Sequence, residues 1–225
     1  MITPITSMPR SMTSAWSRDP MILLTMKDQE RSGRSLEMGT ARVEAFSDGV
    51  MAVIITIMAF ELRAPRGATL DAVRDQLPGL FAYVLSFVML GIYWNNHHHL
   101  LRVADRISGA AMWANLFLLF WLSLIPVLTE WLRDEYRHAL PAAAYGAVAL
   151  AAGFAYALLV RTLIHANGRG SALAEAIGSD VKGYASLVLY AAGVALAFVS
   201  PWISYVLYVA VALMWFVPDR RFTRS

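Results

Sequence analysis

The strongest chemical signal in this sequence is a group of polar side chains at the start of an apolar segment, residues 42–62. Arg42, Ser47 and Asp48 fall in its first two turns, and the segment is long enough for a helix to cross a bilayer. A carboxylate inside a membrane helix costs roughly 2.5 to 3.5 kcal/mol, so it usually faces a bundle interior, a partner or an ion path. Two interpretations follow: a polar clamp at a helix end, or part of an ion path.

One face of the same segment is nearly apolar. Its residues recur at spacings of three and four, which places them on one side of a helix. Thr56 supplies the only hydroxyl on this face. Arg42 and Asp48 stand too far around the helix for i, i+4 pairing, so we expect partners on other helices. Ser47 and the histidines at 97–99 are the candidates. The face comprises Phe46, Gly49, Val53, Thr56, Ile57 and Phe60.

Composition places the chain in a membrane. Its 225 residues are 58% hydrophobic and only 16% charged, whereas about a quarter of a soluble domain is charged. Each charge-poor stretch approaches the roughly 20 residues that cross a hydrocarbon core. The sequence therefore predicts an all-α, polytopic membrane protein with six transmembrane helices. The stretches are 43–60, 80–94, 110–128, 139–160, 184–199 and 201–217.

The basic residues follow the same topology. With the N-terminus inside, only five of the 19 Lys and Arg residues lie outside: Arg63, Arg66, Arg74, Arg133 and Arg137. This bias satisfies the positive-inside rule, puts both termini in the cytoplasm and explains the net charge of +3 without nucleic acid. We expect a disordered cytoplasmic tail over residues 1–38, a six-helix domain over 39–219 and a short basic tail over 220–225.

Local signals position the helices within that domain. Thr69 is a plausible N-cap for a short amphipathic turn. The second span leads to a polar corner at residues 94–99, and Pro126 is expected to kink the third. Small residues at four-residue spacing in the fourth permit close packing. The tight connection at residues 200–202 predicts an antiparallel hairpin. The expected spans are 41–62, 78–95, 108–131, 140–163, 181–199 and 202–218.

Two short sequence motifs resemble those of a known protein family. Residues 42–48 match the pattern RxxxFSD and are followed by Gly49-Val50, and residues 94–100 read WNNHHHL, an aromatic residue followed by histidines. On these residues the chain resembles the transmembrane protein 175 family of potassium channels, in its single-repeat bacterial form. The resemblance covers residues 40–218 at the level of architecture.

The resemblance implies a passive potassium-permeable channel in a bacterial inner membrane. The family assembles as a homotetramer whose first helices line a central pore in the lipid bilayer. Monovalent cations would be its ligands, with K⁺ as the permeant ion and no cofactor. Selectivity would come from side chains of the first helix, including a hydrophobic constriction.

Carried over by motif position, the constriction falls at Val53, the hydroxyl layer at Thr56 and the outer apolar layers at Ile57 and Phe60. Four copies of one residue around an axis form a ring, and a narrow apolar ring gates by dewetting. Val53 is smaller than the residues common at that position, and Phe60 is bulkier. A wider inner ring weakens discrimination between potassium and sodium, and a bulky outer ring could become the tighter gate.

Other residues have supporting roles in this reading. Glu61 would lie at the pore mouth, where a ring of carboxylates concentrates cations, or would be a solvated acid beside Arg63. A structural network holding the first helix against its neighbours is expected at the cytoplasmic side. Its members are Arg42, Phe46, Ser47, Asp48, Trp94 and His98.

Competing functions remain open from the residues alone. A proton-coupled secondary transporter would use Asp48 and the histidines as a relay, but no inverted repeat supports it. A non-conducting structural membrane protein would need only the clamp. Three consecutive helical histidines point about 100° apart and cannot chelate one ion well, so no metal is expected. No hydrolase or phosphate-loop motif indicates an enzyme.

Overall fold

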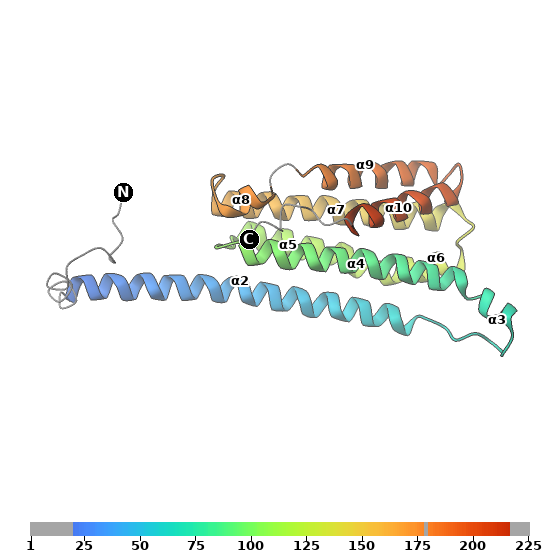
Figure 1. Ribbon diagram of the computed structural model, residues 1–225, viewed down its shortest axis with the longest axis horizontal. Helices are drawn as coiled ribbons and strands as arrows, with labels where there is room; N and C mark the ends of the chain where they lie inside the picture. Colours follow the sequence, from blue (N-terminus) through green and yellow to red (C-terminus); the bar gives the residue numbers. More distant parts are fainter. Residues whose placement is uncertain (1–19, 178–179, 217–225) are drawn as a thin grey trace.

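The computed structural model describes residues 20–177 and 180–216, with side chains from residue 39 onward except that of Ala176. Every regular element in this part of the chain is a helix, and the longer ones lie side by side in a bundle (Figure 1). Residues 1–19 of the expected N-terminal tail (1–38) and the whole expected C-terminal tail (220–225) lie outside the described residues. The helices are α2 (Pro20–Phe60), α3 (Leu70–Arg74), α4 (Leu77–Val103), α5 (Gly109–Ser123), α6 (Ile125–Asp134), α7 (Ala139–Asn167), α8 (Ala172–Ile177), α9 (Val181–Leu196) and α10 (Pro201–Phe216).

Four helical stretches of the described chain are long and apolar enough to cross a membrane. They are Gly39–Phe60, Leu70–Val103, Gly109–Asp134 and Ala139–Asn167. α9 and α10 are apolar but have 16 residues each, about 24 Å at 1.5 Å per residue. That length falls short of the roughly 30 Å hydrocarbon core. The bundle is therefore a multi-pass membrane protein with four clear spans and a shorter apolar hairpin.

α2 is much longer than the expected span. Where the sequence predicts a disordered tail up to residue 38, the helix already begins at Pro20. Proline is favoured in the first helical turn, and the following residues are rich in Met, Leu, Lys, Glu and Arg, which are good helix formers. In Figure 1 this N-terminal part of α2 extends beyond the other helices.

The polar corner expected at residues 94–99 is wrong. α4 continues to Val103, so all three histidines lie inside a helix. Leu100 and Leu101 are 5% and 2% exposed, so the buried face of α4 persists beyond the histidines. Polar side chains mid-helix are tolerated here because neighbouring helices supply partners, as described below.

The kink expected at Pro126 is confirmed as a break. α5 ends at Ser123 and α6 begins at Ile125. Proline has no N–H to donate to the carbonyl four residues earlier, and its ring crowds that carbonyl. α5 begins at a serine cap, in which the Ser108 hydroxyl accepts a hydrogen bond from the Ala111 N–H at 3.2 Å. The predicted Thr69 cap of α3 is likewise confirmed, with Ala72 as donor at 3.2 Å.

The centre of the bundle is organised around Tyr208 of α10. Its hydroxyl donates to the Ala142 carbonyl at 3.0 Å. A Cβ on Gly146 of α7, or on Gly193 of α9, would overlap the Tyr208 side chain. The small residues of α7 therefore make room for an aromatic ring as well as for a neighbouring helix. The predicted α9–α10 hairpin is confirmed, with Ser204 donating to the Gly193 carbonyl at 2.7 Å.

Candidate functional site

α2 has two chemically different faces. The face toward the bundle buries Ser47, Met51, Ile54 and Met58, none of them more than 4% exposed. The opposite face leaves large apolar side chains uncovered, because α2 lies along one side of the bundle (Figure 1). This uncovered face is the one whose residues share a three- and four-residue spacing. Its residues are Phe46 (53% exposed), Gly49, Val53 (57%), Thr56, Ile57 (46%) and Phe60 (82%).

Thr56 is the polar position on the uncovered face. Its hydroxyl donates to the carbonyl of Ala52, one turn earlier, at 2.7 Å. The proton is therefore used within the helix, and the oxygen keeps lone pairs that can accept or coordinate. An exposed oxygen of this kind, between apolar neighbours, can contact a cation.

The C-terminal end of α2 is held by Arg133 of α6. Its Nη1 donates to the carbonyl of Glu61 at 2.6 Å, while its other nitrogens contact Asp134 and Glu130. The Glu61 side chain has no ion pair with a described residue, and Arg63 contacts Glu130 at 3.8 Å instead. Glu61 thus stands at the end of the uncovered face with its carboxylate unpaired in this part of the chain.

A chain of hydrogen bonds joins α2 to α5 and α4 near the other end of the spanning part. His97 Nε2 lies 2.7 Å from Asn115 Oδ1, and the Asn115 amide donates to the Ser47 hydroxyl at 2.9 Å. Ser47 in turn donates to the carbonyl of Val43 at 2.8 Å. All three side chains are buried. Since an amide oxygen only accepts, Nε2 carries the proton, and Nδ1 is left buried without a partner among the described residues.

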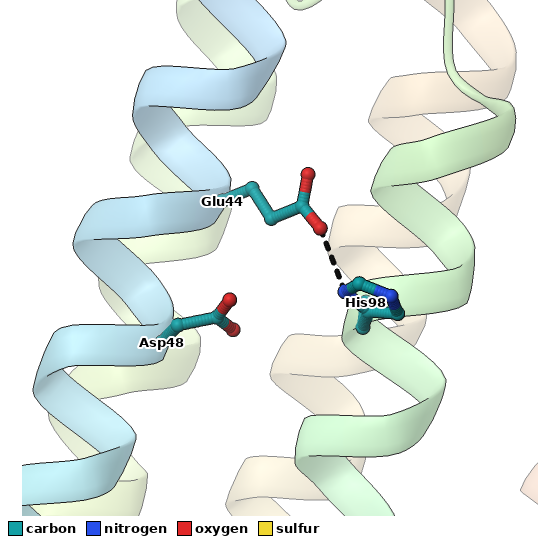
Figure 2. A group of neighbouring side chains, drawn as sticks. All are labelled: Glu44, Asp48 and His98. Carbon is teal, nitrogen blue, oxygen red and sulfur yellow. Dashed lines mark ion pairs between the residues drawn. The ribbon is translucent and has the colours of Figure 1, made fainter.

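A second polar group lies beside this chain. Figure 2 shows Glu44 and Asp48 on successive turns of α2, both directed toward His98 on α4. His98 Nδ1 is 2.7 Å from Glu44 Oε1, although the two groups are not aligned as a regular hydrogen bond. Asp48 Oδ1 is buried and has no hydrogen-bond partner in the described chain. Because the side chains of Glu44 and His98 are only 22% and 25% exposed, their contact is weakly screened by water.

The same three side chains form a group that by residue type could hold a metal ion. One ligand atom from each lies within 4.8 Å of the others. Around a tetrahedral ion bound at 2.0–2.1 Å, ligand atoms are about 3.3 Å apart. The 2.7 Å contact between Glu44 and His98 is shorter and would have to open. The arrangement as it stands is a direct carboxylate–imidazole contact, and we assign it no metal.

The expected network is gathered only in part. Ser47, Asp48 and His98 lie in the two polar groups, and Trp94 stacks on His98 with ring centroids 5.8 Å apart. Phe46 instead belongs to the uncovered face. Arg42 is exposed and makes no hydrogen bond or ion pair with a described side chain. At six positions from Asp48, its side chain points away from that group.

Glu44 and Asn115 were not among the expected members of these groups, and His97 was expected only as one of three candidate histidines. Asn115 was the easiest of them to predict from the sequence, because a lone amide in the apolar α5 is costly unless it is hydrogen-bonded. Glu44 lies one turn before Asp48, which places both carboxylates on one side of the helix. The choice of His97 for Asn115 depends on the rotation of α4, which no local pattern specifies.

Known proteins resemble this chain over most of its length. The family described as "Endosomal/lysosomal potassium channel TMEM175" matches residues 42–126. A potassium channel of Chryseobacterium sp. (strain P1-3) is 45% identical over 188 residues, covering 84% of this chain and 98% of that protein. A potassium channel of Streptomyces collinus (strain DSM 40733 / Tue 365) is 36% identical over 128 residues, or 53% of this chain and 62% of that protein. The crystal structure of a lysosomal potassium-selective channel TMEM175 homolog from Chamaesiphon minutus superposes with a TM-score of 0.65 at 26% identity, covering 80% of this chain and 97% of that one.

Proposed function

Since the chain belongs to the TMEM175 family of potassium channels, we propose that it forms a passive, potassium-permeable cation channel. The subunits assemble as a homotetramer, and the uncovered face of α2 lines a central pore. The observation that carries this proposal is the pattern of exposure along α2. Large apolar side chains stay uncovered on one face while the opposite face is packed into the bundle.

The uncovered face has the chemistry of a gated pore. In a tetramer its residues become rings: Val53 forms an apolar constriction, Thr56 a layer of hydroxyl oxygens, and Ile57 and Phe60 further apolar layers. Apolar rings gate by dewetting, and oxygen rings replace part of an ion's hydration shell. Glu61 at the mouth supplies a ring of carboxylates that raises the local cation concentration.

The remaining helices position α2. In this proposal the short α9 and α10 also cross the membrane, which gives six transmembrane helices with both termini in the cytoplasm of a bacterial cell. Ser47, Asp48 and His98, with Glu44, His97 and Asn115, hold α2 against α4 and α5 at the cytoplasmic end. Arg42, exposed in the subunit, lies where a neighbouring subunit could approach.

The test is cation flux into liposomes that contain the purified protein, first under a potassium gradient and then under a sodium gradient. We expect potassium flux to exceed sodium flux and to need no proton gradient. Thr56→Val removes the hydroxyl ring at nearly constant volume and should reduce the potassium-to-sodium ratio severalfold. Thr56→Ser keeps the hydroxyl and should retain the ratio.

Two results would contradict the proposal. Saturable uptake that requires a proton gradient would identify a transporter. Absence of flux from a folded tetramer, under all voltages and pH values tried, would favour the non-conducting alternative.

A further inference from the structure

A large cavity opens on the side of the bundle formed by α4, α7, α9 and α10, and no residue of α2 lines it. Its volume is about 580 Å³, inside the roughly 300–1,000 Å³ range of ligand pockets. Most of its lining is aliphatic or aromatic, including Leu85, Met89, Val160 and Val211. The proposed ion path on α2 does not use this cavity.

The cavity is elongated along the helices. On α4 its lining runs from Leu85 to Asn96, about 16 Å of helix at 1.5 Å per residue. One leaflet contributes about half of the roughly 30 Å hydrocarbon core. A cavity of this depth, parallel to the spans, matches the length of the acyl region of one leaflet.

Polar and basic groups gather at one end of the cavity, where α7 ends and α9 begins. Arg161 lines this mouth, is exposed, and donates to the Tyr184 hydroxyl at 3.2 Å. The Lys182 ammonium lies 5.8 Å from the ring centroid of Trp215, which also lines the cavity. Arg161 therefore lies at the entrance to an apolar space, and Lys182, outside the lining, lies against the Trp215 wall of that space.

One carboxylate is also present at the mouth. Asp180 lines the cavity, but its Oδ1 accepts a hydrogen bond from the Gly183 N–H at 3.0 Å and caps α9. The N-terminal end of a helix carries a partial positive charge that offsets a capping carboxylate. The net character of the mouth remains basic.

We propose that this cavity binds an acidic phospholipid, with one acyl chain in the apolar part and the phosphate at Arg161 and Lys182. Basic groups at the end of an apolar space between membrane helices are the complement of an anionic lipid head group. Trp215 lies beside Lys182, and tryptophan is enriched where membrane helices meet the lipid head groups. The proposal goes beyond ion conduction and does not depend on it.

Native mass spectrometry of the detergent-purified full chain tests the proposal. The probes are phosphatidylglycerol and phosphatidylcholine with identical acyl chains, and oleate. We expect phosphatidylglycerol adducts to survive at activation energies that remove phosphatidylcholine. Arg161→Gln and Lys182→Gln should each weaken phosphatidylglycerol binding about five-fold, as a charge near a lipid surface contributes about that factor. Arg169→Gln, at an exposed cation that neither lines the cavity nor contacts a lining aromatic ring in the described chain, is the matched control.

A second pair of variants tests the cavity itself. Ala157 lines it, so Ala157→Phe should remove most of the bound phosphatidylglycerol, whereas Ala147→Phe, at an exposed alanine of the same helix outside the lining, should not. The oligomer mass in the same spectra reports whether each variant is folded and assembled. The proposal is wrong if both phospholipids bind equally, if Ala157→Phe and Ala147→Phe behave alike, or if oleate alone occupies the site.

Discussion

Asn115 is the residue whose side chain links three helices by hydrogen bonds. It donates to Ser47 of α2 and accepts from His97 of α4, both within 2.9 Å. Leaving a buried polar group without its partner costs about 1–3 kcal/mol, although hydrogen bonds inside membranes average nearer 0.6 kcal/mol. The position therefore influences both stability and the placement of α2.

Asn115→Leu should lower the thermal stability of the purified assembly, because it leaves the buried His97 N–H without an acceptor and removes the amide that donates to the Ser47 oxygen. Thermal melting followed by tryptophan fluorescence measures the effect. Asn95→Leu, at an exposed asparagine of α4, is the control and should change the melting midpoint little. Equal effects of the two substitutions would show that the hydrogen-bond chain is dispensable.

Val53 forms the inner apolar constriction of the proposed pore, so the polarity of this ring sets the free-energy cost of wetting it. Val53→Asn should hydrate the constriction and raise potassium flux several-fold in liposomes. The same substitution at Val206, an exposed valine of α10, should leave flux unchanged. If flux does not rise in Val53→Asn, the gate lies at another ring, with Phe60 as the next candidate.

At the scale of the element, α2 is fixed at its far end by one arginine. The Arg133 guanidinium contacts the α2 terminus while its stem passes over Gly79 of α4. A Cβ on Gly79 would lie 2.7 Å from Arg133 Cγ, so the glycine makes room for the stem. The side chain of Arg133 is only 10% exposed. These contacts tie the C-terminal end of α2 to α4 and α6.

Arg133→Gln should therefore loosen that end of α2. Hydrogen bonds to a charged group contribute about 1.5–3 kcal/mol, and about 2–4 °C of melting temperature accompanies each kcal/mol in a chain of this size. We expect a drop of several degrees, together with faster amide exchange in residues 57–61. Arg74→Gln, whose ion pair with Asp71 is highly exposed, should alter neither. Unchanged amide exchange in Arg133→Gln would show that Arg133 does not hold the C-terminal end of α2.

The helix boundaries also show which parts of the fold can be predicted from one sequence. Charge-poor stretches located the apolar helices, and Thr69 and Pro126 predicted a cap and a break, because these signals are local. The end of α4 was misplaced because the histidines were read as a corner. Their tolerance inside a helix comes from Glu44 and from Asn115, which are distant in sequence. Contacts of this kind depend on how helices rotate against each other, which periodicity leaves undetermined.

At the scale of the whole molecule, one subunit does not enclose an ion path along α2. Its apolar face is uncovered, and large exposed apolar surfaces mark contact sites or lipid-facing surfaces. Rotational assembly around an axis beside α2 would cover that face and convert it into rings. The proposed conducting path therefore belongs to the oligomer, whereas the contacts that position α2 lie within one subunit.

Cysteine scanning along α2 tests this central claim most directly, since the chain contains no native cysteine. Single cysteines are introduced from residue 49 to residue 60, and potassium flux in liposomes is measured before and after a water-soluble thiol reagent. We expect block at positions 49, 53, 56, 57 and 60 and none at the buried positions 51, 54 and 58. Block at the buried positions, or no helical periodicity at all in active variants, would contradict a pore lined by the uncovered face of α2.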